Sequence, residues 1–190
     1  AYTQTSGTID TRKGSFDAYI WLATPDYENA QYTEPLVKGK YFTDNDVANA
    51  NMVCVIDELT ALYLFGNTDV IGMSVELKVD SSIQNVNIIG IRKTSQEMME
   101  AEKQYQAMGM DKSISLEMPF TVSNAFGNPI EAFPAVSITA YDKEQAAGVA
   151  KNAVQILNSR HQNLGDSPFI QQKPMDFSDM FGSIDRKSVM

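Results

Sequence analysis

The fold is decided by residues 39–92, which read GKYFTDNDVANANMVCVIDELTALYLFGNTDVIGMSVELKVDSSIQNVNIIGIR. The apolar run at 52–56 is short and β-branched, which favours a buried strand over a helix. Asp57 is suited to cap a following helix, and Gly66 supplies a helix stop. The apolar side chains between them recur at intervals of three, so we expect this face to pack on the core: Leu59, Leu62 and Phe65.

Residues on either side of this helix have turn chemistry. Residues 43–46 carry side chains that bond nearby backbone, and Gly72 allows a tight turn. The apolar runs 73–79 and 86–92 are separated by the turn residues 80–82. The sequence therefore predicts a turn, a strand, a short helix and a β-hairpin in succession.

The order of these segments resembles the MacB-type periplasmic core domain, the extracytoplasmic domain of FtsX-like ABC transporter permeases. The resemblance starts at GKYF (39–42), where Lys40 stands in the place of the family's usual Arg. It continues through VCVI (53–56) into a helix that ends in LFG (64–66), an IG turn (71–72) and the strand IIGI (88–91). These are packing and turn patterns, and their order and spacing carry the resemblance.

The resemblance extends to both ends of the chain. Asp26 and Tyr27 match a turn of the family, Met118-Pro119-Phe120 resembles its "vyvP" segment, and Leu157 precedes a matching Arg-His pair. The residues to which the resemblance assigns a structural motif role are Gly39, Phe42, Asp46, Leu64, Phe65, Gly66, Gly72, Gly90, Pro119, Arg160 and His161.

Outside the central stretch, the N-terminal residues alternate loosely and predict strands at 2–9 and 16–23 around a turn at 12–15. A helix is predicted over 94–107, capped by Thr94 or Ser95. The strand predicted over 114–122 is interrupted by Pro119, and proline inside a strand favours an edge position.

The C-terminal part predicts a strand–helix–strand unit. Residues 135–141 alternate as a half-buried strand, Asp142 caps a helix with an apolar stripe over 143–160, and 167–173 predict a further strand. Residues 176–190 are polar and mixed, and we expect a short helix leading towards the membrane.

The composition suits a globular protein of one domain or two small ones. The chain has 190 residues, of which 43% are hydrophobic and 21% charged, with a net charge of −9. This acidity argues against a nucleic-acid partner and against broad docking on anionic lipid. The sequence contains no apolar run long enough to span a bilayer and no signal peptide.

Candidate chemical groups are few. The single cysteine, Cys54, lies inside the apolar strand and is interpreted as a small hydrophobic residue. The single histidine, His161, is explained by its place at a helix end. Asp44, Asp46 and Glu58 are interpreted as turn and cap residues, since the spacing of a calcium loop is absent. We therefore expect no catalytic, metal or cofactor site.

Two sets of side chains have alternative interpretations. The methionines fill irregular gaps in the core or form an adaptable apolar surface for a lipid, peptide or protein: Met98, Met99, Met108, Met110 and Met118. The aromatic residues belong mostly to the core or line a ligand cleft: Tyr19, Trp21, Tyr27 and Tyr32.

The resemblance implies an α+β domain of two subdomains. Residues 1–51 and 131–182 are expected to form a discontinuous porter-like βαβ part, and 52–130 an inserted, strand-rich, sabre-like part. Residues 183–190 form a tail towards a membrane helix. The family usually opens with a strand and helix that are not found here, so the porter-like part is expected to be incomplete.

The implied function is that of the extracytoplasmic domain of an ABC transporter permease. It would couple ATP-driven motion of the membrane part to a substrate or partner outside, for export of a peptide, antibiotic or lipoprotein, or for signalling. The implied partners are a cognate ABC ATPase, a second permease in a homodimer or heterodimer, and a peptide, lipid or protein ligand. The alternative is a secreted or surface ligand-binding module without transport. An enzyme is disfavoured, because the usual catalytic constellations are missing.

Overall fold

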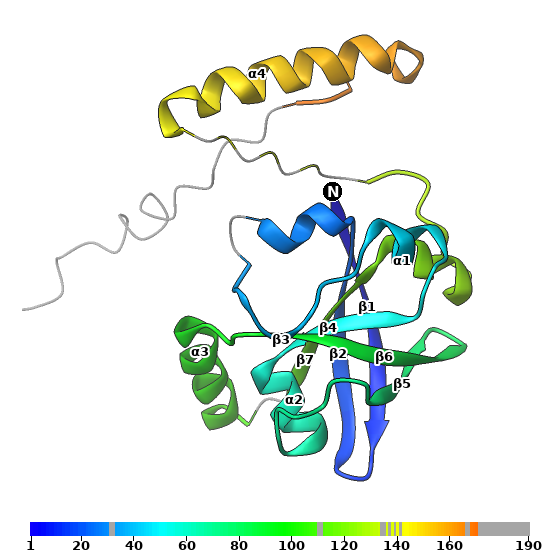
Figure 1. Cartoon of the computed structure of the whole chain (residues 1–190), viewed down its shortest axis with the longest axis vertical. Helices are drawn as coiled ribbons and strands as arrows, with labels where there is room; N and C mark the ends of the chain where they lie inside the picture. Colours follow the sequence, from blue (N-terminus) through cyan, green and yellow to red (C-terminus); the bar gives the residue numbers. More distant parts are fainter. Residues whose placement is uncertain are drawn as a thin grey trace, which may run out of the picture. The chain divides into compact units, whose positions relative to one another are not determined.

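The computed structural model describes residues 1–30, 33–109, 112–133, 136, 138, 140, 142–165 and 168–170 (Figure 1). The chain forms two compact units, Ala1–Ser137 and Ile138–Met190. Its mixture of helices and sheet confirms the predicted α+β class.

Strands make up most of the first unit. Its described part contains the strands β1 (Tyr2–Thr11), β2 (Gly14–Ala23), β3 (Leu36–Gly39), β4 (Val53–Asp57), β5 (Ser74–Val79), β6 (Ser82–Arg92) and β7 (Ser113–Pro119). The helices between them are η1 (Pro25–Asn29), α1 (Asp44–Ala48), α2 (Glu58–Phe65), α3 (Gln96–Ala107) and η2 (Phe120–Phe126).

These strands form one sheet that closes on itself. The order is β3-β6-β4-β7-β2-β1-β5, and β5 also pairs with β6. The ring is therefore closed by two contacts, the β5–β6 hairpin and a short β1–β5 pairing at Thr8↔Lys78 and Ile9↔Leu77. β3 stands outside the ring and pairs with the C-terminal end of β6.

The interior of this closed sheet is the main hydrophobic core. Successive side chains of a strand point to opposite faces, and the residues of β5 alternate between exposed and buried along its length. The inward residues of the other strands join them, among them Ile20, Ile56, Ile88 and Leu116. A smaller cluster lies apart from this core and includes Tyr41, Phe42 and Val55.

The central stretch folds as its local signals predict. The run at 52–56 becomes β4, and the carboxylate of Asp57 accepts a hydrogen bond from the backbone N–H of Thr60 at 2.7 Å as the N-cap of α2. Gly66 ends α2 in the left-handed conformation, with φ of 83°. The predicted hairpin is β5–β6, with a two-residue turn at Asp80 and Ser81.

The predicted core face of α2 is wrong in one residue. Leu62 is 46% exposed, whereas the buried residues of the helix are Thr60, Ala61 and Leu64. A strict interval of three drifts away from the 3.6-residue period, so Leu62 turns outward while Leu64 enters the core. Phe65 is half-buried and packs against the core, as predicted.

The predicted edge position of β7 is also wrong. β7 lies inside the sheet, parallel to β2 and antiparallel to β4. Pro119 is its last residue and faces Ala23, while β4 pairs only with Leu116 and Glu117. The missing N–H of the proline therefore costs no hydrogen bond to β4. The strand also stops earlier than predicted, because η2 starts at Phe120.

Three local features were missed or left open. The turn predicted at 43–46 opens the short helix α1, and β3 was not predicted. Ser95, not Thr94, caps α3 through the backbone N–H of Met98. Thr94 is buried and instead accepts a hydrogen bond from the backbone N–H of Leu59 at 3.0 Å. This bond joins the end of β6 to the start of α2.

The second unit contains the clearest helix of the sequence. α4 (Lys143–Arg160) is capped by Asp142, as predicted, and is followed by η3 (Gln162–Leu164). The predicted strands at 135–141 and 167–173 fall largely outside the described residues, and the tail at 176–190 falls entirely outside them. None of the helices in the described ranges has the length and apolar character needed to cross a membrane.

The predicted division into 1–51 with 131–182, and 52–130, stays a prediction. Within the first unit, β1, β2 and β3 come from 1–51 and the other four described strands come from 52–130. All of them share one sheet.

Replacing Leu64 by alanine is expected to lower the free energy of unfolding by about 2–5 kcal/mol, because a buried leucine leaves a cavity. The matched variant Leu62→Ala lies on the exposed side of the same helix and should stay within about 0.5 kcal/mol of the wild type. Urea unfolding followed by circular dichroism measures both. Equal losses in the two variants would show that α2 is oriented differently.

Candidate functional site

Two glycines of the family motif face each other across neighbouring strands. Gly39 of β3 pairs with Gly90 of β6, and the backbone N–H of Lys40 donates to the carbonyl of Ile89 at 3.0 Å. Gly39 has φ of 74°, and a Cβ on it would collide with the carbonyl oxygen of Ile89. A Cβ on Gly90 would collide with the carbonyl oxygen of Lys40. Both positions therefore need glycine so that the two backbones can approach.

The other motif residues of the first unit occupy caps, turns and packing positions. The ring of Phe42 is buried and stacks on Tyr41 at 4.1 Å between centroids. Asp46 and Thr43 form the capping box of α1. Leu64, Phe65 and Gly66 end α2, Gly72 has φ of 84° in a turn, and Pro119 ends β7. Their role as a shared family motif remains a prediction.

The remaining motif pair lies in the second unit. Arg160 is in the last turn of α4, where a positive charge complements the helix dipole. His161 follows as the C-cap residue, is exposed, and its ring lies 5.4 Å from that of Phe169. The structure thus separates this pair from the other motif residues into a different unit.

A buried ion pair that the sequence analysis missed lies outside the main core. Arg92, at the end of β6, is only 5% exposed. Its Nε donates to Oε1 of Glu117 at 2.7 Å and its Nη2 to Oε2 at 3.0 Å. The hydroxyl of Tyr41 donates to the same Oε2 at 2.7 Å, and the guanidinium lies 5.0 Å from the centre of the Tyr41 ring. Bidentate pairing of this kind is the strongest geometry for a buried ion pair.

The same guanidinium holds the segment that follows η1. Its Nη1 donates to the carbonyl oxygen of Glu34, and its Nη2 to that of Glu28 at 3.2 Å. Nearby, the ring of Tyr27 lies 5.1 Å from Tyr2 and stacks on Trp21 at 6.3 Å. Arg92 therefore ties the chain between η1 and β3 to the sheet.

The electrostatics of this network favour its present protonation state. Burial, followed by the charge of Glu117, raises the pKa of Tyr41 well above its ordinary value. The same two causes raise the pKa of Tyr27 to about 12. Both phenols are therefore neutral at physiological pH. Because the carboxylate of Glu117 already accepts three hydrogen bonds, the network is suited to hold structure.

The other candidate groups have structural environments. Burial raises the pKa of the Cys54 thiol to about 12, so it stays protonated. Asp46 caps α1, and Glu58 accepts a hydrogen bond from the backbone N–H of Thr94 at 3.2 Å. Within the described ranges, no three side chains of the metal-binding types come together.

The methionines divide between the two interpretations. Met118 is fully buried in the core, whereas Met98, Met99 and Met108 on and after α3 are 49%, 43% and 71% exposed. Met110 lies outside the described residues. The core interpretation thus fails for α3, because the helix buries no residue and is held by polar contacts around the hydroxyl of Tyr63.

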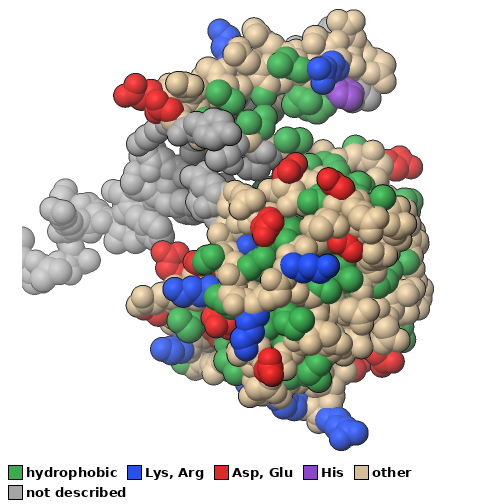
Figure 2. Space-filling view, in the orientation of Figure 1, with side chains coloured by type: hydrophobic (Ala, Val, Ile, Leu, Met, Phe, Trp, Pro, Cys, Tyr) green, Lys and Arg blue, Asp and Glu red, His purple; other side chains and the backbone are tan. Residues whose placement is uncertain are grey.

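The aromatic residues are less buried than predicted. Tyr19 is 50% exposed on β2, Trp21 and Tyr27 are half-buried, and Tyr32 lies outside the described residues. Figure 2 shows acidic and basic side chains interspersed on the visible face.

The ion pair left one signal in the sequence. Arg92 ends an apolar strand and Glu117 lies inside another, at positions where a charged residue is rarely buried without a partner. Neither residue identifies its partner, because 25 positions separate them.

Comparison with known families and structures gives a consistent result. The MacB-like periplasmic core domain matches residues 1–156. The extracellular domain of the noncanonic ABC-type transporter YknZ from Gram-positive bacteria has a TM-score of 0.61 and 22% identity, over 85% of this chain and 74% of that one. The periplasmic region of MacB from Actinobacillus actinomycetemcomitans has a TM-score of 0.63 and 19% identity, over 97% and 75%. A search of curated proteins gave no match.

The ion pair generates a stability prediction. Arg92→Met or Glu117→Leu alone should cost about 3–5 kcal/mol of unfolding free energy, because each leaves one buried charge without its partner. The double variant should cost at least about 2 kcal/mol less than the sum of the two. A double-mutant cycle by urea unfolding measures this coupling, and additive losses would contradict the pairing.

Proposed function

Because the chain belongs to the MacB-like periplasmic core domain family, we propose that it couples ATP-driven motion of a permease to a substrate or partner outside the membrane. The observation that carries this proposal is the family match over residues 1–156, which also identifies the chain as the extracytoplasmic domain of an ABC transporter permease. Permeases of this type work with an ATPase partner.

The finer assignments are part of the proposal. The cognate ATPase acts on this domain through the membrane part of the permease, and two permeases assemble as a homodimer or heterodimer. The domain itself carries out no catalysis. Its substrate or partner is a peptide, an antibiotic, a lipoprotein or a signalling protein.

The build of the first unit supports a mechanical role. A coupler has to move as a body, because a soft domain would absorb the displacement of the membrane helices. The closed sheet gives each ring strand a neighbour on both sides for part of its length, and Arg92 fastens the segment after η1 to it. Packed interiors have low compressibility and transmit strain.

Motion of the domain can be measured in the permease that contains it. Cys54 is fully buried with a raised pKa, so a cysteine introduced at the exposed Gln104 of α3 can be spin-labelled selectively. We expect the distance between labels on two permeases, measured by pulsed electron paramagnetic resonance, to change between the nucleotide-free and the vanadate-trapped transporter.

The parent protein without Gln104→Cys is the labelling control and should take up little label. Vanadate trapping must abolish ATP hydrolysis in the labelled sample. An unchanged distance distribution in a transporter that hydrolyses ATP would contradict coupling and favour a static ligand-binding role.

A further inference from the structure

One strand of the closed sheet leaves much of an edge open. β1 pairs with β2 along its full length, but with β5 only at Thr8 and Ile9. Among the described residues, no strand pairs with the second edge of β1 from Tyr2 to Gly7. Alternate residues of an antiparallel strand direct their N–H and C=O groups to that side. Such an edge is a template for another extended chain.

A pocket of about 140 Å³ lies beside this open edge. Thr3 and Thr5 of β1 form one wall. Most of the remaining lining is apolar and comes from Leu22, Val79, Phe126 and Ile130. The space exceeds that of a single water molecule and suits one small aliphatic side chain.

The pocket also contains a polar group that lacks a partner. Ser123, in η2, is 3% exposed, and its Oγ makes no hydrogen bond within the described structure. Buried hydroxyls are normally hydrogen-bonded, so an exception calls for an explanation. A ligand that brings a polar group to the pocket would supply the missing bond.

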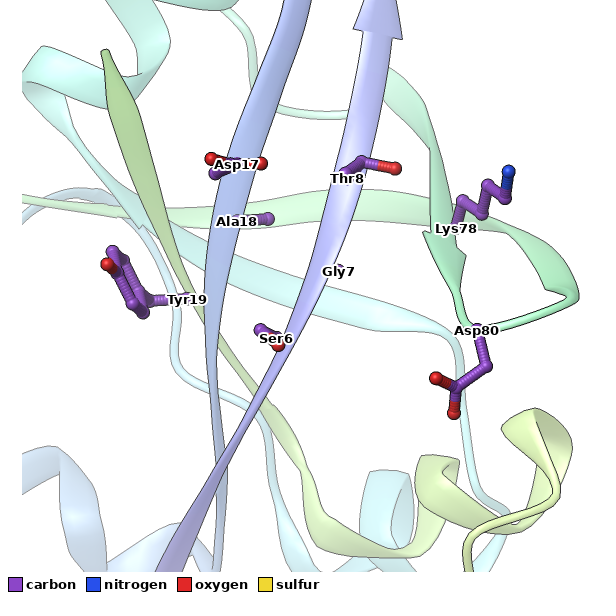
Figure 3. A pocket seen from close by; sticks show the side chains of 8 residues that line it. All are labelled: Ser6, Gly7, Thr8, Asp17, Ala18, Tyr19, Lys78 and Asp80. Carbon is purple, nitrogen blue, oxygen red and sulfur yellow. The ribbon is translucent and has the colours of Figure 1, made fainter. Parts of the chain in front are cut away.

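A second hollow continues along the same strand on its other face. It is lined by Ser6 and Thr8 of β1, Asp17 and Tyr19 of β2, and Lys78 and Asp80 across the gap where β5 diverges (Figure 3). Asn128, from the rim of the first pocket, donates to the carboxylate of Asp80 at 2.9 Å. The two hollows therefore share one boundary.

The two faces of β1 explain this arrangement. Odd-numbered residues such as Thr3 and Thr5 lie on the side of the core residue Ile9, and even-numbered residues such as Ser6 and Thr8 lie on the other side. A strand added to β1 would alternate in the same way. Its inward side chains would meet the apolar pocket, and its outward ones the polar hollow with two carboxylates and one ammonium group.

We propose that the open edge of β1 binds an extended peptide as an additional strand, with a small aliphatic side chain in the pocket beside Ser123. Outward positions of the peptide carry polar or basic side chains, which complement Asp17 and Asp80. Main-chain hydrogen bonds hold the peptide, and the pocket selects its inward residue. The inference rests on the edge and the pocket, and does not require the coupling role.

The test uses the 190-residue chain and a set of synthetic heptapeptides. Alanine, valine, isoleucine or leucine occupies alternate positions of each peptide, and threonine or lysine the others. We expect at least one peptide to shift the amide resonances of Thr3, Thr5 and Gly7 saturably in ¹⁵N spectra. Methylation of alternate peptide nitrogens should weaken binding by about tenfold or more, because it removes the paired N–H groups.

Ser123→Ala separates binding from structure. Because the hydroxyl has no partner, its removal should not lower the thermal midpoint of the free domain. It should weaken the best peptide by about threefold to tenfold, the effect of one hydrogen bond. Ser74→Ala, on the exposed side of β5, is the matched control and should leave binding unchanged.

Three results would overturn the proposal. They are the absence of a saturable shift with every peptide, equal binding of the methylated peptide, and Ser123→Ala binding that equals the wild type. A permease whose domain binds no peptide but still moves on vanadate trapping would retain the coupling role, so the two proposals fail separately.

Discussion

The guanidinium of Arg92 holds together parts of the first unit that the backbone alone would leave apart. β6 and β7 lie on either side of β4, and the Arg92–Glu117 pair spans that strand. The same side chain binds the carbonyl oxygens of Glu28 and Glu34, so one charge orders both the sheet and the segment that follows η1. A buried ion pair contributes little net stability, but its hydrogen bonds fix one arrangement, since each alternative leaves a charge unpaired.

The closed sheet and this charge divide the work of folding between two surfaces. The apolar interior supplies most of the hydrophobic burial, while the smaller cluster with Tyr41 and Phe42 lies apart from it. Closure removes most strand edges, which otherwise invite pairing with other chains. β1 is the exception from Tyr2 to Gly7, and the pocket with the unpartnered Ser123 lies there. The edge left unpaired is thus also where a buried polar group has no partner.

The local elements of residues 39–92 could be predicted, because each one has its own signal. Asp57 and Gly66 mark the ends of α2, and alternation marks β5. The resemblance of the ordered segments also gave the family. The sequence could not reveal that β7 lies inside the sheet, because strand order depends on pairings between distant residues. It could not pair Arg92 with Glu117 for the same reason, and it misplaced Leu62 because three-residue spacing only approximates a helical face.

The central claim is that Arg92 fastens the segment after η1 to the closed sheet. Amide hydrogen exchange tests it through the N–H groups of Ala30 and Thr33, which bond the carbonyls of Tyr27 and Ala30. The variant to compare is Arg92→Met/Glu117→Leu, which leaves no buried charge unpaired. The account predicts faster exchange at Ala30 and Thr33 than in the wild type, with protection at Val55 and Ile88 retained. Unchanged exchange at Ala30 and Thr33 would contradict it, because the segment would then be held without Arg92.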